Sequence, residues 1–306
     1  MESNLRSKAL TRSHGWADIL FTFVVYFIAV FALIAVGYPL YNVIISSVSD
    51  PDAIYQGKVL FLPVKPTLEA YEAVFNYPSI WQGYRNSLFY TFAGTFINLI
   101  VTVLAAFPLA RRDLYGRNIL TFVFSFTMFF SGGMIPTYIV VMRLNLLNSI
   151  WAMLIPGAMS VWNMIIMRTF FQSTIPEELY EATLLDGGND VQYLLRVVLP
   201  LSKAILAVLG LYYAVGHWNS YFNALIYLNN NDLYPLQVFM RRILVLNEVD
   251  VDMMGMVNVT ELATLRRRSE LLKYALIIVS SLPVMLLYPF VQRYFVQGVM
   301  IGSIKG

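Results

Sequence analysis

The sequence predicts an all-α integral membrane protein with six transmembrane helices. Only 13% of its 306 residues are charged and 58% are hydrophobic, whereas soluble domains carry about 25% charged residues. Several runs without a charged residue are long enough to cross a hydrocarbon layer of ~30 Å, which takes about 20 residues. These runs are continuously apolar and do not alternate, so they predict helices and not the strands of a barrel.

We expect a single membrane domain over 1–306. Charged residues bracket each of its apolar runs. The predicted spans are 19–40, 87–110, 118–142, 149–171, 204–228 and 274–292. The third contains "SGGMIP", which either breaks the helix or lets a neighbouring helix approach closely. The connections include a cytoplasmic loop over 172–200 and external loops over 41–85 and 229–273.

The distribution of Lys and Arg predicts that both termini are cytoplasmic, because basic residues gather in short cytoplasmic loops. Arg6, Lys8 and Arg12 precede the first run, which is too long for the apolar part of a signal peptide, so we expect a retained anchor. The external loop 229–273 opposes this orientation through Arg266–Arg268, but long loops weigh less in the rule.

The composition excludes several classes of protein. The chain has no cysteine and only two histidines, His14 and His217, so it predicts no metal site and no disulfide. Basic residues sit at the ends of apolar runs, which does not favour nucleic-acid binding. The phosphate-binding motif GxxxxGK[ST] is missing, and we identify no catalytic residue.

The span interiors hold no Asp, Glu, Lys or Arg, which disfavours a carrier driven by protons or sodium. Apart from Arg168 near the end of 149–171, His217 is the one Asp, Glu, Lys, Arg or His within a predicted span. We interpret it as a hydrogen-bonded residue between helices, with a proton relay as the alternative.

The polar loop 172–200 predicts a helix, a sharp turn and a second helix. Thr174 and Glu177 fit a capping box at the start. Gly187 and Gly188 end the first helix, and Asn189 or Asp190 caps a second one that stops at Pro200. The polar face of the first helix is acidic, whereas helices lying on membranes are usually basic. A protein partner is therefore favoured over a lipid surface.

"EATLLDGGNDVQYLLRVVLP", from Glu181 to Pro200, resembles the EAA loop of ATP-binding-cassette (ABC) importer permeases. The matching positions are Glu181, Ala182, Asp186, Gly187, Tyr193, Val198 and Pro200. Thr183 and Gly188 stand where alanine is commoner. "WNSYFNALIYL" and the ending "RYFVQGVMIGSIKG" are similar to permeases of the maltose G-subunit family. The long loop with "YPLQVFMRRIL" resembles the branch for complex oligosaccharides such as alginate, pectin or aldouronate fragments.

This resemblance implies a type I ABC importer permease fold, in which the first helix of the loop is a coupling helix docked on an ATPase. Leu179, Ala182 and Leu185 would fill the ATPase groove, and Glu181 would help to hold the loop. The coupling residues implied are Glu178, Leu179, Glu181, Ala182, Leu185, Asp186, Gly187, Gly188 and Pro200.

The resemblance also implies the partners and the location. They are a second homologous permease, two ATPase subunits, an extracellular binding protein that delivers an oligosaccharide, and the lipid of a bacterial cytoplasmic (inner) membrane. ATP and Mg would be bound by the ATPase, and this chain would hold no cofactor.

Amide and aromatic side chains in the spans are candidates for contact with a sugar. They are Asn98, Trp162, Asn163, Trp218, Asn219, Tyr221 and Asn223. The alternative for each is a hydrogen bond between helices, which contributes about 0.6 kcal/mol. The rival function is an ATP-independent facilitator or channel for small polar solutes.

Overall fold

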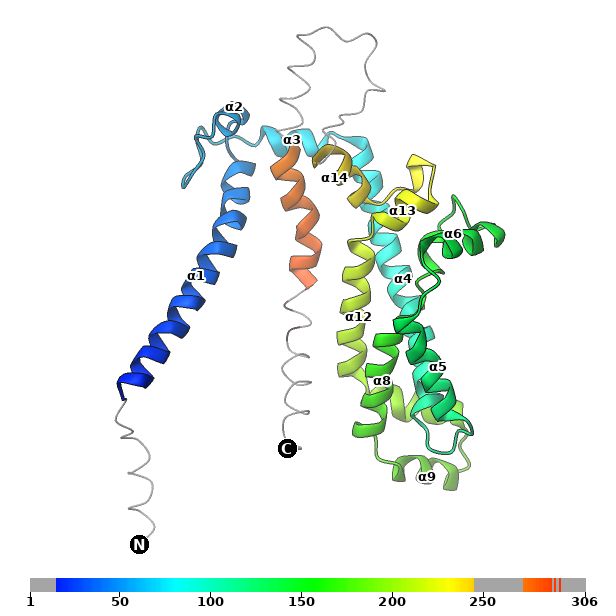
Figure 1. Cartoon of the computed structure of the whole chain (residues 1–306). Helices are drawn as coiled ribbons and strands as arrows, with labels where there is room; N and C mark the ends of the chain where they lie inside the picture. The colour runs from blue at the N-terminus through cyan, green and yellow to red at the C-terminus, as the bar shows by residue number, and fades with distance from the viewer. Residues whose placement is uncertain (1–14, 245–271, 288, 290–291, 293–306) are drawn as a thin grey trace.

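The computed structural model describes residues 15–244, 272–287, 289 and 292, and in these ranges the regular structure is helical, without strands (Figure 1). Several sequence observations fall outside the described residues. They are the basic residues at 6–12, the run Arg266–Arg268 and most of the loop around it, and the ending 293–306.

Two helices are each long and apolar enough to cross a membrane: α1 (Trp16–Ser47) and α4 (Pro78–Ala110). They contain the predicted spans 19–40 and 87–110. The apolar side chains of α1 are exposed along almost its whole length, and α1 stands apart from the other helices (Figure 1). The short helices α2 (Pro51–Tyr55) and α3 (Glu69–Phe75) connect α1 to α4 at one end of the molecule.

Three predicted spans are not single helices. Residues 118–142 form α5 (Arg117–Phe129) and α6 (Met134–Arg143), which are bent by 113°. Residues 149–171 are divided between α7 (Trp151–Leu154) and α8 (Val161–Thr174), and residues 204–228 between α12 (Lys203–Trp218) and α13 (Phe222–Tyr227). In the described ranges, length and composition give two spanning helices, or up to four if each bent pair is one span.

The break between α5 and α6 lies in the "SGGMIP" segment. Gly133 has φ +84°, a left-handed region in which a side chain at Cβ is strained, and it forms the N-cap of α6. Of the two interpretations of this segment, the structure supports the helix break.

α4 lies at the centre of the fold. It packs against α8 and α12 along its length and against α14 (Leu236–Leu244) at the end that carries α2 and α3. At the opposite end, a core cluster joins α4, α8 and α12 through residues such as Ala106, Met167 and Leu209, which are all fully buried. The helix Leu272–Leu287, which overlaps the predicted span 274–292, packs against Trp218.

The gap between α7 and α8 exposes backbone groups that a continuous helix would have paired. The side-chain amide of Asn98 on α4 donates to the carbonyl of Gly157 at 2.6 Å, and the N–H of Ser160 donates to the Tyr213 hydroxyl on α12 at 3.2 Å. The side-chain oxygen Oδ1 of Asn98 lies 2.8 Å from Nε2 of His217. His217 is therefore a hydrogen-bonded residue between helices, as predicted.

Replacing Asn98 by Leu should destabilise the protein by about 1–3 kcal/mol, because the buried Asn98 would lose its hydrogen bonds to the Gly157 carbonyl and to His217. Thermal unfolding of the purified protein in detergent should show a lower midpoint. Asn223→Leu, at an exposed position, is the control and should leave the midpoint unchanged. An unchanged midpoint for Asn98→Leu, together with a loss of transport, would instead place Asn98 in a substrate path.

Candidate functional site

The loop between α8 and α12 lies at the end of the molecule opposite α2, α3 and α14 (Figure 1). It contains α9 (Glu178–Leu185), a turn, α10 (Asp190–Tyr193), a π-helical stretch η1 (Leu194–Val198) and α11 (Leu199–Leu201). The predicted order of helix, turn and helix is confirmed. The second helical stretch ends one residue beyond Pro200 and then bends by 81° into α12.

The predicted capping box at Thr174 and Glu177 is wrong. Thr174 is the last residue of α8, and α9 begins at Glu178 without a side-chain cap. The Glu177 carboxylate instead forms an ion pair with Arg112, at 3.2 Å. Arg112 lies in the turn that follows α4. An ion pair with a distant segment has replaced the local contact that the pattern predicted.

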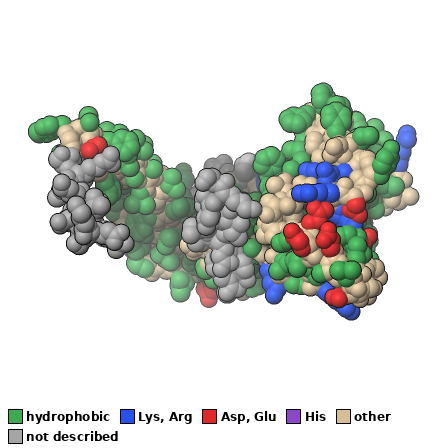
Figure 2. Space-filling model, turned by 90° about the horizontal axis from the view of Figure 1, so that it is seen from below, with side chains coloured by type: hydrophobic (Ala, Val, Ile, Leu, Met, Phe, Trp, Pro, Cys, Tyr) green, Lys and Arg blue, Asp and Glu red, His purple; other side chains and the backbone are tan. Residues whose placement is uncertain are grey.

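α9 has no buried residue, and most of its side chains are exposed. Leu185 is 89% exposed and Leu184 49%. The predicted contact residues Leu179 and Ala182 are exposed as well, together with Glu178 and Asp186. In Figure 2, which views this end, acidic side chains gather beside basic ones among apolar surface. The helix is therefore an accessible surface with both apolar and acidic groups.

Two roles are open for Glu181, contact with the ATPase or bracing of the loop from within, and the structure does not show the bracing. Its side chain is exposed, and among the described residues its carboxylate has no hydrogen bond or ion pair. The helical register of α9 points it outward. This carboxylate is free to meet a partner.

The turn after α9 is a Schellman motif. The N–H of Gly188 donates to the carbonyl of Thr183 at 2.8 Å, and the N–H of Gly187 donates to the carbonyl of Leu184 at 3.0 Å. Gly187 has φ +74°, which explains why glycine is required there. Its Cβ direction is open, so a substitution would meet backbone strain without a steric clash.

Gly188 is restricted by lack of space. A Cβ on Gly188 would lie 2.6 Å from the Thr183 methyl carbon and 2.9 Å from the Thr183 carbonyl oxygen. The two departures from the EAA pattern therefore contact each other. Thr183 is larger than the usual alanine, and Gly188 is smaller, so the pair keeps the turn closed.

The second helical stretch starts at Asn189, one of the two predicted caps. Asn189 and Gln192 form a reciprocal capping box, with N–H to oxygen distances of 2.9 and 3.1 Å. Pro200 lacks an N–H and so cannot donate a helical hydrogen bond. The residues just before it, Leu194–Val198, have the wider π-helical geometry. Tyr193, Leu194 and Val198 are buried in the core cluster that includes α4.

Arg111, the first residue after α4, joins the loop to the body of the protein. Its Nη1 donates to a carboxylate oxygen of Asp190 at 2.5 Å, and its Nε donates to Asp113 at 2.8 Å. Its guanidinium lies 3.8 Å from the centre of the Tyr180 ring. The hydrogen bonds with Arg111 lower the pKa of Asp113 below its ordinary value, so this carboxyl is charged at neutral pH.

The C-terminal end of α4 is capped by side chains of other helices. Arg168 Nε donates to the Leu109 carbonyl at 2.8 Å, Gln172 donates to the Ala110 carbonyl at 3.1 Å, and Arg117 donates to the Arg111 carbonyl at 3.1 Å. Basic groups at a helix C-terminus also interact favourably with its dipole. The end of α4 is thereby tied to α8, which leads directly into the loop.

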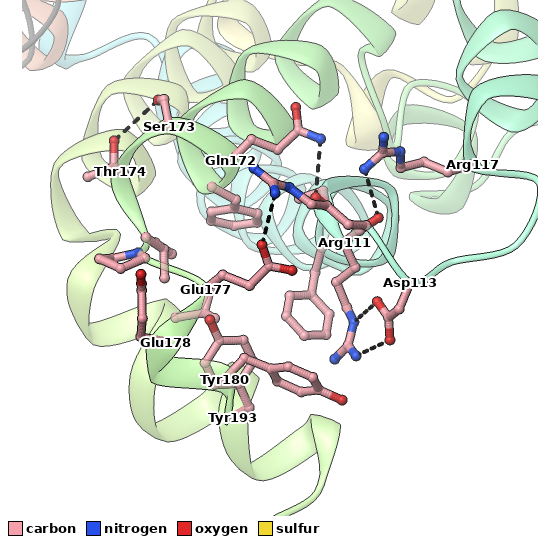
Figure 3. A pocket seen from close by; sticks show the side chains of 17 residues that line it. Arg111, Asp113, Arg117, Gln172, Ser173, Thr174, Glu177, Glu178, Tyr180 and Tyr193 are labelled. Atoms are coloured by element: carbon pink, nitrogen blue, oxygen red, sulfur yellow. Dashed lines mark hydrogen bonds and ion pairs between the residues drawn. The ribbon is translucent and has the colours of Figure 1, made fainter. Parts of the chain in front are cut away.

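A cavity of about 760 Å³ separates the start of α9 from the turn after α4 (Figure 3). Its lining includes Arg111, Arg112 and Arg117 as well as Asp113, Glu177 and Glu178. Basic and acidic groups balance around it, so the cavity does not favour an ion of one sign.

The candidate sugar-contacting residues fall into two groups. Asn98, Asn163 and Trp218 are buried, and Trp218 donates from Nε1 to the Ser280 carbonyl at 3.0 Å. Trp162, Asn219, Tyr221 and Asn223 are exposed. The buried Asn98 and Trp218 make the contacts between helices that the alternative interpretation expected. The exposed four are accessible to a substrate.

Sequence reasoning missed Arg111, Tyr180 and Leu184 at this site. No local pattern marks Arg111, because it is 79 positions away in the sequence from Asp190, its contact. Leu184 could have been found, since a short helix without tertiary cover exposes apolar residues on every side.

The chain is similar to transport permeases, although no family profile matches it. It is 39% identical over 291 residues to the polygalacturonan/rhamnogalacturonan transport system permease protein YtcP of Bacillus subtilis (strain 168), covering 94% of this chain and 99% of the relative. It is 38% identical over 268 residues to Protein LplC of the same strain, covering 88% and 89%. A solved structure of a bacterial ABC transporter involved in the import of the acidic polysaccharide alginate matches with a TM-score of 0.85 and 35% identity, covering 93% of this chain and all of that chain.

Gly188→Ala should destabilise the turn by about 1–3 kcal/mol, because the new methyl group has no space beside Thr183. Thr183→Ala combined with Gly188→Ala should recover part of the loss, since it removes the closer contact. Thermal unfolding of both variants measures the effect. Gly216→Ala is the matched control, because its Cβ would meet no atom within 4 Å. Equal destabilisation in the single and double variants would contradict a steric contact between the Thr183 side chain and a methyl group at position 188.

Proposed function

Because the chain belongs to the permease subunits of ABC importers, we propose that it carries an oligosaccharide into the cell using ATP hydrolysed by a separate subunit. The observation that carries the proposal is α9, a well-formed helix that buries none of its own residues. Exposed apolar side chains such as Leu184 and Leu185 beside acidic groups are typical of a surface that a partner protein covers.

The partner that fits this surface is the ATPase. Its groove would accept the leucines, and basic groups at its rim would face Glu178 and Glu181. The Schellman turn and the Asn189 capping box hold the loop in one shape before docking, which reduces the entropy lost on binding. ATP and Mg would then be bound by the ATPase and not by this chain.

The orientation follows from this docking. If α9 is cytoplasmic, the Trp16 end of α1 is cytoplasmic as well, because both lie at the same end of the molecule (Figure 1). Arg111, Arg112 and Arg117 then lie inside, in agreement with the positive-inside rule. We propose six spans: α1, α4, the pairs α5/α6, α7/α8 and α12/α13, and the helix Leu272–Leu287. Both termini would be cytoplasmic, in a bacterial cytoplasmic (inner) membrane.

The complete transporter would hold further proteins. A second, homologous permease would complete the path, since α1 and the outer face of α4 expose apolar side chains that need lipid or another helix. Two ATPase subunits would bind below, and an extracellular binding protein would deliver the sugar above.

The substrate we propose is an oligosaccharide of the general kind named for the relatives, which include pectin-type and alginate importers. Trp162 and Tyr221 offer aromatic faces, and Asn219 and Asn223 offer amide groups. Aromatic and amide side chains suit the apolar faces and hydroxyl groups of sugars. We propose these four exposed residues as the contacts of the path.

Reconstitution separates this function from an ATP-independent facilitator. The complete transporter in liposomes should take up oligosaccharide only when ATP and the binding protein are present. The chain with its partner permease alone should show no uptake. Uptake of the same sugar without the ATPase subunits would contradict the proposal.

Leu185→Glu should weaken association with the ATPase by about tenfold or more, because it places a charge in an apolar contact. Co-purification with the ATPase subunits measures the loss, and thermal unfolding shows that the permease is still folded. Tyr55→Glu, equally exposed on α2 at the opposite end, should leave the ATPase bound. Full retention of the ATPase by Leu185→Glu would argue against α9 as the docking helix.

A further inference from the structure

We propose that Arg111 is the positioning residue that transmits movement of α9 to α4, an inference that rests on the proposed docking of α9 on the ATPase. α9 has little other attachment to the body of the protein. Tyr180 is the α9 side chain that packs against the core cluster containing α4. Force applied to α9 must therefore pass through the contacts of Tyr180 or along the backbone at either end of the helix.

Tyr180 is held on two sides. The Arg111 guanidinium lies over its ring, 3.8 Å from the ring centre, and the Tyr193 ring meets it edge to face, with the centres 5.1 Å apart. The Tyr180 hydroxyl donates to Asp190 at 3.1 Å, the same carboxylate that accepts from Arg111. One guanidinium thus fixes α9 through Tyr180 and α10 through Asp190.

The geometry requires arginine. Asp113 takes two hydrogen bonds, from Nε and Nη2 of Arg111, and thereby orients the guanidinium plane. Nη1 remains for Asp190, and the flat face remains for Tyr180. Lysine has neither the planar fork nor the stacking face. The Arg111 side chain is only 14% exposed, although that of Asp190 is 61% exposed. The guanidinium is therefore largely withdrawn from water, unlike that of Arg112.

The neighbouring ion pair does not provide such a link. The side chains of Arg112 and Glu177 are 80% and 54% exposed, and exposed pairs of this kind contribute little. The cavity of Figure 3 separates the start of α9 from the turn after α4, so close packing does not join the two at that point. Arg111 crosses this gap from a position adjoining the last residue of α4.

α4 can pass the movement onward. It packs along α12 and α8, and within the membrane region Asn98 on α4 contacts His217 on α12. A shift of the cytoplasmic end of α4 therefore acts on the helices that would border the sugar path.

The test uses the complete transporter in liposomes and measures sugar taken up for each ATP hydrolysed. Arg111→Gln should lower this ratio by about tenfold, because it removes the charge-assisted contacts to Asp190 and Tyr180. The ATPase subunits should still co-purify, and ATP hydrolysis should continue. Arg112→Gln is the control and should keep the wild-type ratio. If Arg111 served folding alone, its replacement would lower stability and leave the sugar taken up for each ATP unchanged.

A double-mutant cycle tests the specific contact. Asp190→Asn should lower the ratio in the same direction, and Arg111→Gln with Asp190→Asn should cost little more than either change alone. Arg111→Lys should not restore the ratio fully. If Arg111→Gln does not assemble, Asp190→Asn and Arg111→Lys still decide the matter. A wild-type ratio in these variants, or additive losses in the cycle, would overturn the proposal.

Failure of the proposed function and failure of the Arg111 role would give different experimental results. If the wild-type chain does not hold an ATPase or does not import sugar with ATP, the proposed function fails. If wild-type import depends on ATP and the Arg111 variants import as much sugar per ATP, only the role of Arg111 fails.

Discussion

Backbone groups left unpaired where helices break must find partners, and most of the fold depends on how α4 meets this constraint. Asn98 pairs with the Gly157 carbonyl in the gap between α7 and α8. Near the outer end, Asn86 donates to the carbonyls of Asp232 and Tyr234 at 2.7 and 3.0 Å. An unpaired carbonyl costs several kcal/mol in a membrane. The continuous α4 therefore allows the helices packed against it to break.

The same helix organises the end of the molecule that carries α9. The second half of the loop is packed into the core beside α4, whereas α9 projects from it and is held through Tyr180 and Arg111. This arrangement combines an exposed docking face with a firm attachment. A loop that is already ordered transfers movement, whereas a flexible one would absorb it. The close approach of α4 and α12 at Gly94, where a Cβ would lie 2.3 Å from His217 Nε2, extends the rigid connection into the membrane region.

Features set by local chemistry could be predicted from the sequence. The conformation of Gly187 and the cap at Asn189 depend on residues within one turn, so the pattern identified both. The capping box at Thr174 failed because Glu177 pairs with Arg112, which is distant in sequence. Apolar composition predicted where spans lie but not where they break, because a bend leaves hydropathy unchanged. The Arg111 contacts depend on how α4 and the loop come together, which no local pattern contains.

The central claim is that α9 is the surface on which the ATPase acts. Since the chain has no cysteine, a single Leu185→Cys variant can be labelled with a membrane-impermeant maleimide without background from this subunit. The measurement compares the labelling rate of the permease pair alone with that of the complete transporter, both in detergent. The account predicts rapid labelling of the permease pair and strong protection once the ATPase subunits are bound. Equal labelling rates in the two samples would contradict it.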